Sequence, residues 1–172
     1  MNEVALKEYF LRVRQGDKDA FTHIYNELKQ PVFTIVCRIV QSREIAEDIT
    51  QDLFVKLFVS PPDSSIINVR AWIFQMTRNL AIDALRKGQC MDIDDVGIAE
   101  VDQLDGFLLH WDIEAAMRSL PCAEREILSL RINGELTFLE ISRIVDLSLP
   151  ATYRKYRKAI HTLRERLGGG AI

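Results

Sequence analysis

Apolar residues recur every three or four positions along most of the chain, which is the repeat of an α-helix with one buried face. The pattern predicts a first helix over residues 4–14. A longer helix follows, which starts at Asp17 or Asp19 and carries apolar side chains as far as Ile39. Pro31 lies inside it, where a proline kinks or splits a helix because it lacks an N–H.

Two more helical patterns, over residues 46–58 and 69–87, complete the N-terminal half. In the first, the helical period predicts a buried face made of Ile45, Ile49, Leu53 and Leu57. The opposite, exposed face is polar and is made of Asp48, Gln51, Asp52 and Lys56. In the second, the residues expected to pack are Trp72, Ile73, Met76, Leu80 and Leu85. The polar positions that remain would let this helix lie along a phosphate backbone, and they are Arg70, Arg78, Asn79, Arg86 and Lys87.

Residues 136–167 predict a short helix, a three-residue turn and a second, basic helix, which is the order of a helix-turn-helix. Thr137 is placed to cap the first helix, and Glu140 is placed to bond back to the cap. Ser148 is placed to cap the second helix. Pro150 falls in the first turn of that helix, where its missing N–H breaks no helical bond.

The second helix of this motif has one packing face and one cationic face. At about 100° per residue, the side that packs carries Leu149, Thr152, Tyr156, Ile160, Leu163 and Leu167. The opposite side carries Arg154, Lys158 and His161, flanked by Lys155 and Arg157. Such a helix suits the major groove of DNA, where arginine reads guanine and lysine neutralises phosphate. A solvated basic face is the alternative.

Upstream, another amphipathic helix offers a small core made of Ile127, Leu128, Leu130 and Ile132.

Charge separates the two halves of the chain. Residues 89–110 contain six acidic residues and no lysine or arginine. The flanking segments are nearly balanced, with 12 basic and 11 acidic residues through Gly88 and 10 basic and 8 acidic residues from Trp111 onward. The net charge of −3 therefore comes from this segment, which we interpret as a linker, and it does not argue against DNA binding by a local basic patch. The spacing of Val101, Leu104, Phe107 and Leu108 is compatible with a short helix that leads into Trp111, and a disordered tether is the alternative.

The C-terminal motif resembles region 4 of extracytoplasmic-function (ECF) sigma factors of RNA polymerase. The segments that carry this resemblance are Leu120-Pro121 with the glutamates of the next turn, Leu136 to Ser142, and Ala159 to Arg164. The N-terminal segments Ala46 to Phe58 and Val69 to Lys87 resemble the two signature helices of sigma region 2. The resemblance implies an all-α fold of two small helical domains joined by an acidic linker. It assigns residues 1–88 to region 2, 89–110 to the linker and 111–168 to region 4. Because the family commonly carries a proline at the position of Pro31, it also favours one bent helix there.

In the family, the first signature helix of region 2 docks on the clamp helices of the polymerase. The resemblance implies a polymerase-binding set of Asp48, Gln51, Asp52 and the exposed ring of Phe54. The second signature helix and the loop before it, residues 60–68, read and melt the minus-10 element with one base flipped out of the stack. The minus-10 candidates are Asn68, Arg70, Trp72, Arg78, Asn79, Arg86 and Lys87. Trp72 is either a melting wedge or, as its helical spacing favours, a core residue.

Region 4 of the family holds the minus-35 element. The implied DNA-binding residues are Arg154, Lys155, Arg157, Lys158, Ala151 and Tyr153. The chain departs from the family pattern at residues 150–153, where the family usually has Gly-Thr-Val-Lys and this chain has Pro-Ala-Thr-Tyr. The partners implied are core RNA polymerase, promoter DNA and an anti-sigma factor.

Two other classes of function are compatible with parts of the sequence. The first is a stand-alone helix-turn-helix regulator whose N-terminal half senses a ligand or dimerises. The second is an enzyme, which the sequence does not favour because no glycine loop for phosphate is present and the histidines stand apart at His23, His110 and His161.

The cysteines are odd in number and are expected to be free thiols, at Cys37, Cys90 and Cys122. We expect no metal and no cofactor. We also expect no membrane insertion, because no apolar run approaches the roughly 18 residues that span a bilayer. The N-terminus lacks the pattern of a signal peptide, so a cytoplasmic protein is expected.

Overall fold

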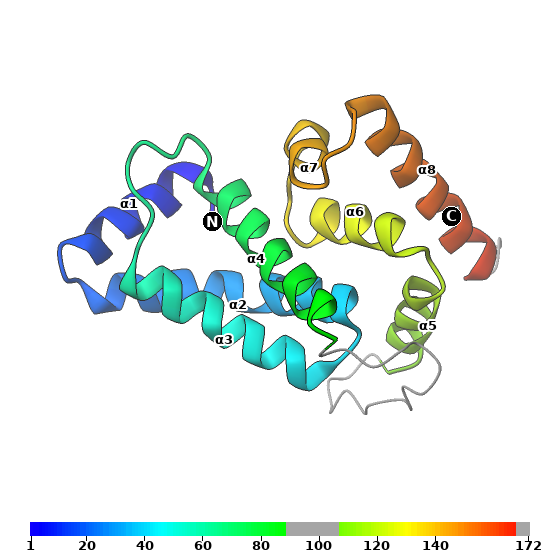
Figure 1. The fold of residues 1–172 in the computed structure, drawn as a ribbon, viewed down its shortest axis with the longest axis horizontal. Helices are drawn as coiled ribbons and strands as arrows, with labels where there is room; N and C mark the ends of the chain where they lie inside the picture. Colours follow the sequence, from blue (N-terminus) through cyan, green and yellow to red (C-terminus); the bar gives the residue numbers. More distant parts are fainter. Residues whose placement is uncertain (89–106, 168–172) are drawn as a thin grey trace. The chain divides into compact units, whose positions relative to one another are not determined.

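The computed structural model describes residues 1–88 and 107–167, and the side chains of the second range from residue 113 onward. Eight α-helices form the regular structure of these ranges (Figure 1). The chain divides into two compact units, Met1–Met91 and Asp92–Ile172. The prediction of an all-α fold with two small helical domains is confirmed. The residues between 89 and 106, which make up most of the predicted linker, lie outside the described ranges.

The first unit is built around one long helix. Its four helices are α1 (Glu3–Arg14), α2 (Lys18–Val40), α3 (Arg43–Val59) and α4 (Val69–Arg86). The α2 helix packs against each of the other three, and it runs without a break through Pro31, so the prediction of a single helix there is confirmed. The buried face of α2 includes Ala20, Ile24, Leu28, Val32, Ile35, Val36 and Ile39. Because α2 has an apolar stripe along its whole length, it can cover three partners at once.

Each helix of the first unit begins at a polar side chain that accepts a hydrogen bond from a backbone N–H. The pairs are Asn2 with Ala5, Asp17 with Ala20, Ser42 with Ile45 and Asn68 with Ala71. The first N–H groups of a helix have no partner within the helix, so these acceptors stabilise each start and fix where it lies. Between α1 and α2 the chain turns at Gly16, whose φ of 93° favours glycine.

An aromatic cluster joins α2 to α3. Phe54 lies 4.8 Å from Tyr25 and 6.4 Å from Phe21, measured between ring centroids, in edge-to-face arrangements. Phe58 lies 5.0 Å from Phe21 in the same way. Phe54 is only 4% exposed. The expectation of an exposed Phe54 ring on the polymerase-binding face is therefore wrong, because the neighbouring rings of α2 enclose it.

The second unit contains α5 (Phe107–Arg118), α6 (Cys122–Ile132), α7 (Phe138–Ile144) and α8 (Leu149–Arg166). One buried cluster of this unit is made of Met117, Leu120, Leu128 and Ala159, against which Tyr156, Ile160 and Leu163 pack. Ala159, with its small side chain, is fully buried where α8 packs against α6. The α5 helix begins inside the range predicted as linker, at Phe107.

Three residues of the second unit that were predicted to pack lie exposed at helix ends. Ile132, expected in the core, is 56% exposed. The α6 helix ends at this residue. The following Gly134 lies so close to the carbonyl oxygen of Leu130 that an added Cβ would stand 2.5 Å from it. The buried residues of α6 end at Leu130, so Ile132 lies beyond the part of the helix that packs. Leu149 and Leu167 also lie exposed, at the first residue of α8 and just beyond its last.

Asp17 offers a test of the capping pattern. It caps α2 and pairs with Arg12 at 2.7 Å. The hydrogen bond from the Ala20 N–H, together with Arg12, lowers the pKa of Asp17. The ionised carboxylate therefore stabilises the fold above the ordinary aspartate pKa of about 3.9, and this contribution is lost as the pH falls through the lowered pKa.

We expect Asp17→Ala to lower the urea midpoint of the first unit at pH 7, and the difference from the native chain to shrink below about pH 4. Urea unfolding at several pH values measures both effects. Asp19→Ala is the control, because Asp19 lies in the same first turn without serving as the cap. Equal losses for the two variants would contradict the capping role.

Candidate nucleic-acid and protein interfaces

The helix-turn-helix predicted from residues 136–167 is present as α7, a turn and α8. The hydroxyl of Thr137 accepts from the backbone N–H of Glu140 at 3.3 Å, and the Glu140 carboxylate accepts from the backbone N–H of Thr137 at 2.7 Å. The hydroxyl of Ser148 accepts from the N–H of Ala151 at 3.3 Å. The predicted capping box and the predicted cap of the second helix are both confirmed.

The turn between the two helices depends on one left-handed residue. Asp146 has a φ of 56°, a conformation that aspartate adopts more readily than most residues. The N–H of Leu147 then donates to the carbonyl of Ser142 at 3.0 Å, which closes the end of α7. The turn therefore sets the direction in which α8 leaves α7.

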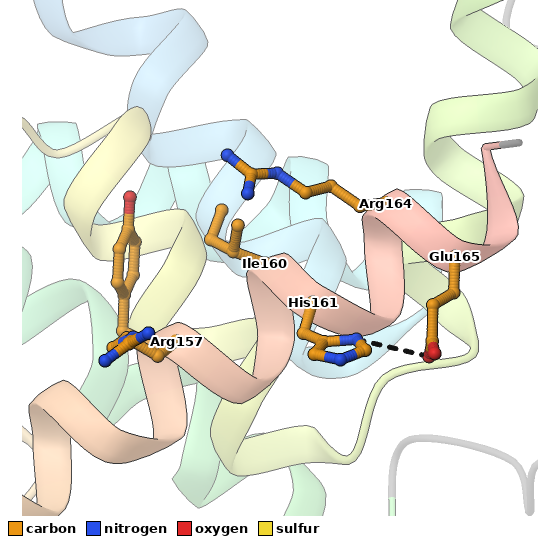
Figure 2. A pocket seen from close by; sticks show the side chains of 6 residues that line it. Arg157, Ile160, His161, Arg164 and Glu165 are labelled. Carbon is orange, nitrogen blue, oxygen red and sulfur yellow. Dashed lines mark ion pairs between the residues drawn. The ribbon is translucent and has the colours of Figure 1, made fainter. Parts of the chain in front are cut away.

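The α8 helix presents cations on one face and packs with the other, as predicted. Thr152 and Ala159 are fully buried. The exposed face carries Arg154, Arg157, Lys158, His161 and Arg164. Lys155 and Ala151 are half-buried at the edge of this face. Figure 2 shows Arg157, His161 and Arg164 along α8, with His161 paired to Glu165 at 3.3 Å. The helix thus presents a cationic strip, and the major groove of DNA admits an α-helix.

Tyr153 takes part in the joint of the motif. Its ring lies 5.3 Å from Phe138, nearly perpendicular to it, and it remains 49% exposed. Phe138 also contacts Tyr156 at 5.0 Å and lies beneath the guanidinium of Arg131. Tyr153 is one of the positions where α8 departs from the family pattern. Its ring packs α8 against α7, and about half of the side chain remains exposed to solvent.

A carboxylate that the sequence analysis did not place there lies beside α8. The side chain of Glu124, in α6, is 4% exposed and lies 3.3 Å from the ammonium of Lys158, whose own side chain is 70% exposed. A buried carboxylate needs a cation or donors, so this pair ties α8 to α6. Sequence reasoning missed Glu124. The available signal was its position one helical turn before Ile127 and Leu128, on the apolar face of α6.

The predicted polar face of α3 is exposed in the first unit. Asp48, Gln51 and Asp52 lie on it. The same face continues toward the end of the helix as an apolar strip formed by Val55 and Val59. An acidic and apolar face of this kind suits a protein surface with basic and apolar side chains.

The minus-10 candidates of α4 differ in exposure. Asn79, Arg86 and Lys87 are exposed, whereas Arg70, Arg78 and Trp72 are half-buried. The guanidinium of Arg70 lies over the Phe74 ring, 5.7 Å from its centroid. Asn68 caps α4, and its side-chain oxygen accepts from Ala71 N–H at 2.8 Å. Phe74, which was missing from the predicted core of this helix, is fully buried.

Comparison with known proteins follows the same division. The family model for Sigma-70 region 2 matches residues 24–89, and that for Sigma-70, region 4 matches residues 116–165. The ECF RNA polymerase sigma factor SigW of Bacillus subtilis is 27% identical over 184 residues, which cover 96% of this chain and 98% of the relative. The ECF RNA polymerase sigma factor SigK of Mycobacterium bovis is 26% identical, with 91% and 90% covered. The chain belongs to the ECF family of sigma factors.

Solved structures share the fold of this sigma factor. The sigma factor RpoE in complex with the anti-sigma factor NepR, from Bartonella quintana, has a TM-score of 0.66 at 19% identity and covers 86% of this chain and 96% of its own. CnrH in complex with the cytosolic domain of CnrY has a TM-score of 0.68 at 18% identity, covering 97% of this chain and 99% of its own.

Membership of the ECF family decides between the functions weighed from the sequence. A sigma factor acts as a subunit of RNA polymerase, so the stand-alone regulator is excluded, because the N-terminal half carries region 2 where that hypothesis required a sensor or dimerisation domain. The enzyme is excluded as well, since sigma factors are initiation factors without catalytic activity. Within the described ranges, no helix has the length and hydropathy to cross a membrane.

The Glu124–Lys158 pair leads to a prediction about stability. We expect Lys158→Ala to lower the free energy of unfolding of the second unit by about 1–3 kcal/mol, because it leaves a buried carboxylate without its cation. Hydrogen exchange of the α6 and α8 amides measures this opening. Arg154→Ala is the control on the same exposed face, with an expected change within about 0.5 kcal/mol. Equal hydrogen exchange in the two variants would show that the second unit does not need Lys158 to keep Glu124 buried.

Proposed function

We propose that the two units divide promoter recognition between them. The first unit binds core RNA polymerase and reads and melts the minus-10 element, and the second unit, from α5 onward, holds the minus-35 element. The acidic residues between them connect the two. The observation that carries this proposal is the match of regions 2 and 4 to consecutive segments of one chain.

The polymerase-binding surface proposed is the exposed face of α3. Asp48 and Asp52 stand one helical turn apart, with Gln51 between them on the same face. Val55 and Val59 extend this face with exposed apolar surface. Two carboxylates beside an apolar strip fit a partner helix that carries cations next to apolar residues. Phe54 has no place in this surface because it is buried.

The minus-10 surface proposed consists of α4 and the loop before it, residues 60–68. Exposed Asn79, Arg86 and Lys87 are placed to contact phosphate or unpaired bases. Arg70, Arg78 and Trp72 are half-buried and supply less of their side chains. Asn68 supports the surface through its cap of α4.

For the minus-35 element we propose the exposed face of α8. Arg154 and Arg157 are the side chains best placed to reach base edges, because each is exposed near the N-terminal half of α8. Lys158 and Lys155 supply charge toward phosphate. Ala151 and Tyr153 lie in the first turns of the helix, where the chain departs from the family sequence.

We further propose an anti-sigma partner and a site of action in the cytoplasm. RpoE and CnrH, which are similar in fold, were each solved with a partner, named for RpoE as an anti-sigma factor. An anti-sigma factor that covers the α3 face or the α8 face of this chain would block polymerase or DNA. Promoter DNA and polymerase meet in the cytoplasm, which is where the chain would act.

A charge reversal tests the polymerase surface. We expect Asp48→Lys with Asp52→Lys to weaken binding to core RNA polymerase by at least about tenfold, because like charges then face the cationic partner. Binding of the labelled full chain to purified core enzyme measures the affinity. The control is Glu8→Lys with Asp19→Lys, which makes the same charge change on exposed residues of α1 and α2. Unchanged affinity of the α3 variant would refute this surface.

Arg154 tests the minus-35 surface without the complication of the Glu124 pair. We expect Arg154→Ala to cost about 1–3 kcal/mol in holoenzyme binding at a cognate promoter and to relax the preference at one position of the minus-35 element. Competition binding with promoters substituted one base at a time measures both. Lys18→Ala removes an exposed cation from the first unit and serves as the control. A promoter indifferent to Arg154→Ala would exclude base contact by this residue.

A further inference from the structure

The N-terminal helix α1 holds the start of α4 and the loop before it. The two carboxylate oxygens of Glu3 accept from the backbone N–H groups of Val69, at 2.6 Å, and Arg70, at 3.1 Å. The ammonium of Lys7, one helical turn along α1, donates to the carbonyl of Ile67 at 2.6 Å. In Figure 1 the loop between α3 and α4 passes beside α1. Three consecutive peptide units of the loop and α4 thus bond to α1 side chains.

These contacts add to the cap that α4 already has. Asn68 accepts from the N–H of Ala71, so Glu3 and Asn68 together satisfy the first three N–H groups of the helix. A carboxylate at a helix N-terminus also interacts favourably with the helix dipole. The chain terminus is anchored as well, since the Met1 ammonium pairs with Glu27 of α2 and the guanidinium of Arg70 donates to the Met1 carbonyl at 3.4 Å. Residues 1–7 therefore form a brace across α2 and α4.

The loop that α1 braces has a defined shape and one exposed apolar side chain. The carboxylate of Asp63 accepts from the backbone N–H of Ser65, a bond that lowers the pKa of Asp63. Ile66 N–H donates to the carbonyl of Asp63 at 3.2 Å. The carbonyl of Ile67 is held by Lys7, while the Ile67 side chain is 87% exposed. The loop thus has a local turn at residues 63–66, is held by α1 at Ile67 and presents the Ile67 side chain outward.

We propose that Glu3 and Lys7 are positioning residues for promoter opening, which hold residues 60–68 and the first turn of α4 in the shape that accepts an unpaired minus-10 base. The inference rests on the proposed minus-10 role of this loop. It adds α1, which lies outside the segment matched by the region 2 model.

The physical reason is preorganisation. Taking a base out of the stack costs a few kcal/mol, which a closely fitting pocket must return. A loop that had to be ordered at each encounter would also lose conformational entropy, so less binding energy would remain for the base. Glu3 and Lys7 fix the backbone of residues 67–70 before DNA arrives. Losing them weakens opening and, because a looser loop fits correct and incorrect bases more equally, also weakens base discrimination.

The test uses reconstituted holoenzyme at saturating sigma factor, with Lys7→Met as the main variant. Permanganate reactivity measures open complexes on a duplex promoter and on the same promoter with the minus-10 base substituted. We expect Lys7→Met to reduce the ratio of cognate to substituted open complexes by about tenfold, the effect of one lost charge-assisted hydrogen bond. Lys7→Arg, which can still donate to the Ile67 carbonyl, should restore the ratio. Glu3→Gln keeps one acceptor, so its ratio should lie between the ratios of Lys7→Met and Lys7→Arg.

Glu8→Gln is the matched control, because Glu8 is an exposed carboxylate on the same helix. A merely structural role for α1 would lower the amount of active holoenzyme without changing the base ratio. An unchanged ratio in Lys7→Met, or an equal change in Glu8→Gln, would overturn the inference. If the native holoenzyme itself shows no minus-10 preference, the proposed minus-10 function fails before Lys7 is tested, so the two failures are distinguishable.

Discussion

The arrangement of this sigma factor depends on the need to satisfy the first N–H groups of each helix. Six of the described helices start at a side chain that accepts from the backbone N–H three residues further on. In water these groups would find partners anywhere, but in a compact bundle they must be met by an acceptor held in place. The cap therefore decides where each helix begins, while the apolar stripe that packs decides which residues fall on its exposed face. Ser148 fixes the start of α8, and Ser42 fixes the start of α3.

The two units meet this requirement in different ways. In the second unit the caps are local, since Thr137 with Glu140 and Ser148 with Ala151 each join residues three apart. Its helix-turn-helix is thus fixed largely by local bonds, and it is joined to α6 by contacts that include the Glu124–Lys158 pair and Arg131 over the Phe138 ring. In the first unit, α4 takes an acceptor from Glu3, which precedes its partner Val69 by 66 residues. The proposed minus-10 surface therefore depends on the N-terminal helix, whereas the proposed minus-35 surface does not.

The same difference explains what the sequence could predict. The capping box at Thr137, the cap at Ser148 and the cationic face of α8 depend on spacings of three to four residues, which are visible in a helical pattern. The continuous α2 was also predicted, although Pro31 alone left two choices. Phe54 was placed wrongly because its burial depends on Phe21 and Tyr25 from another helix, and a helical wheel contains no information about a neighbour. Ile132 was placed wrongly because it is the last residue of α6 and lies beyond the part of that helix that packs, which ends at Leu130.

Glu3 and Glu124 show the limit of pattern reading most clearly. Each carboxylate has a partner on another helix, and each partner would be taken from sequence for an ordinary surface cation or helix terminus. Glu124 at least carried a signal, because a charge on an apolar face requires compensation. Glu3 carried none, since an acidic residue in the first turn of α1 is already explained by that helix's own dipole. Its second role requires that α1 and α4 pack side by side, which is a property of the folded unit. The exposed faces proposed as functional surfaces are therefore predicted by local spacing, while the residues that hold them in position are determined by packing.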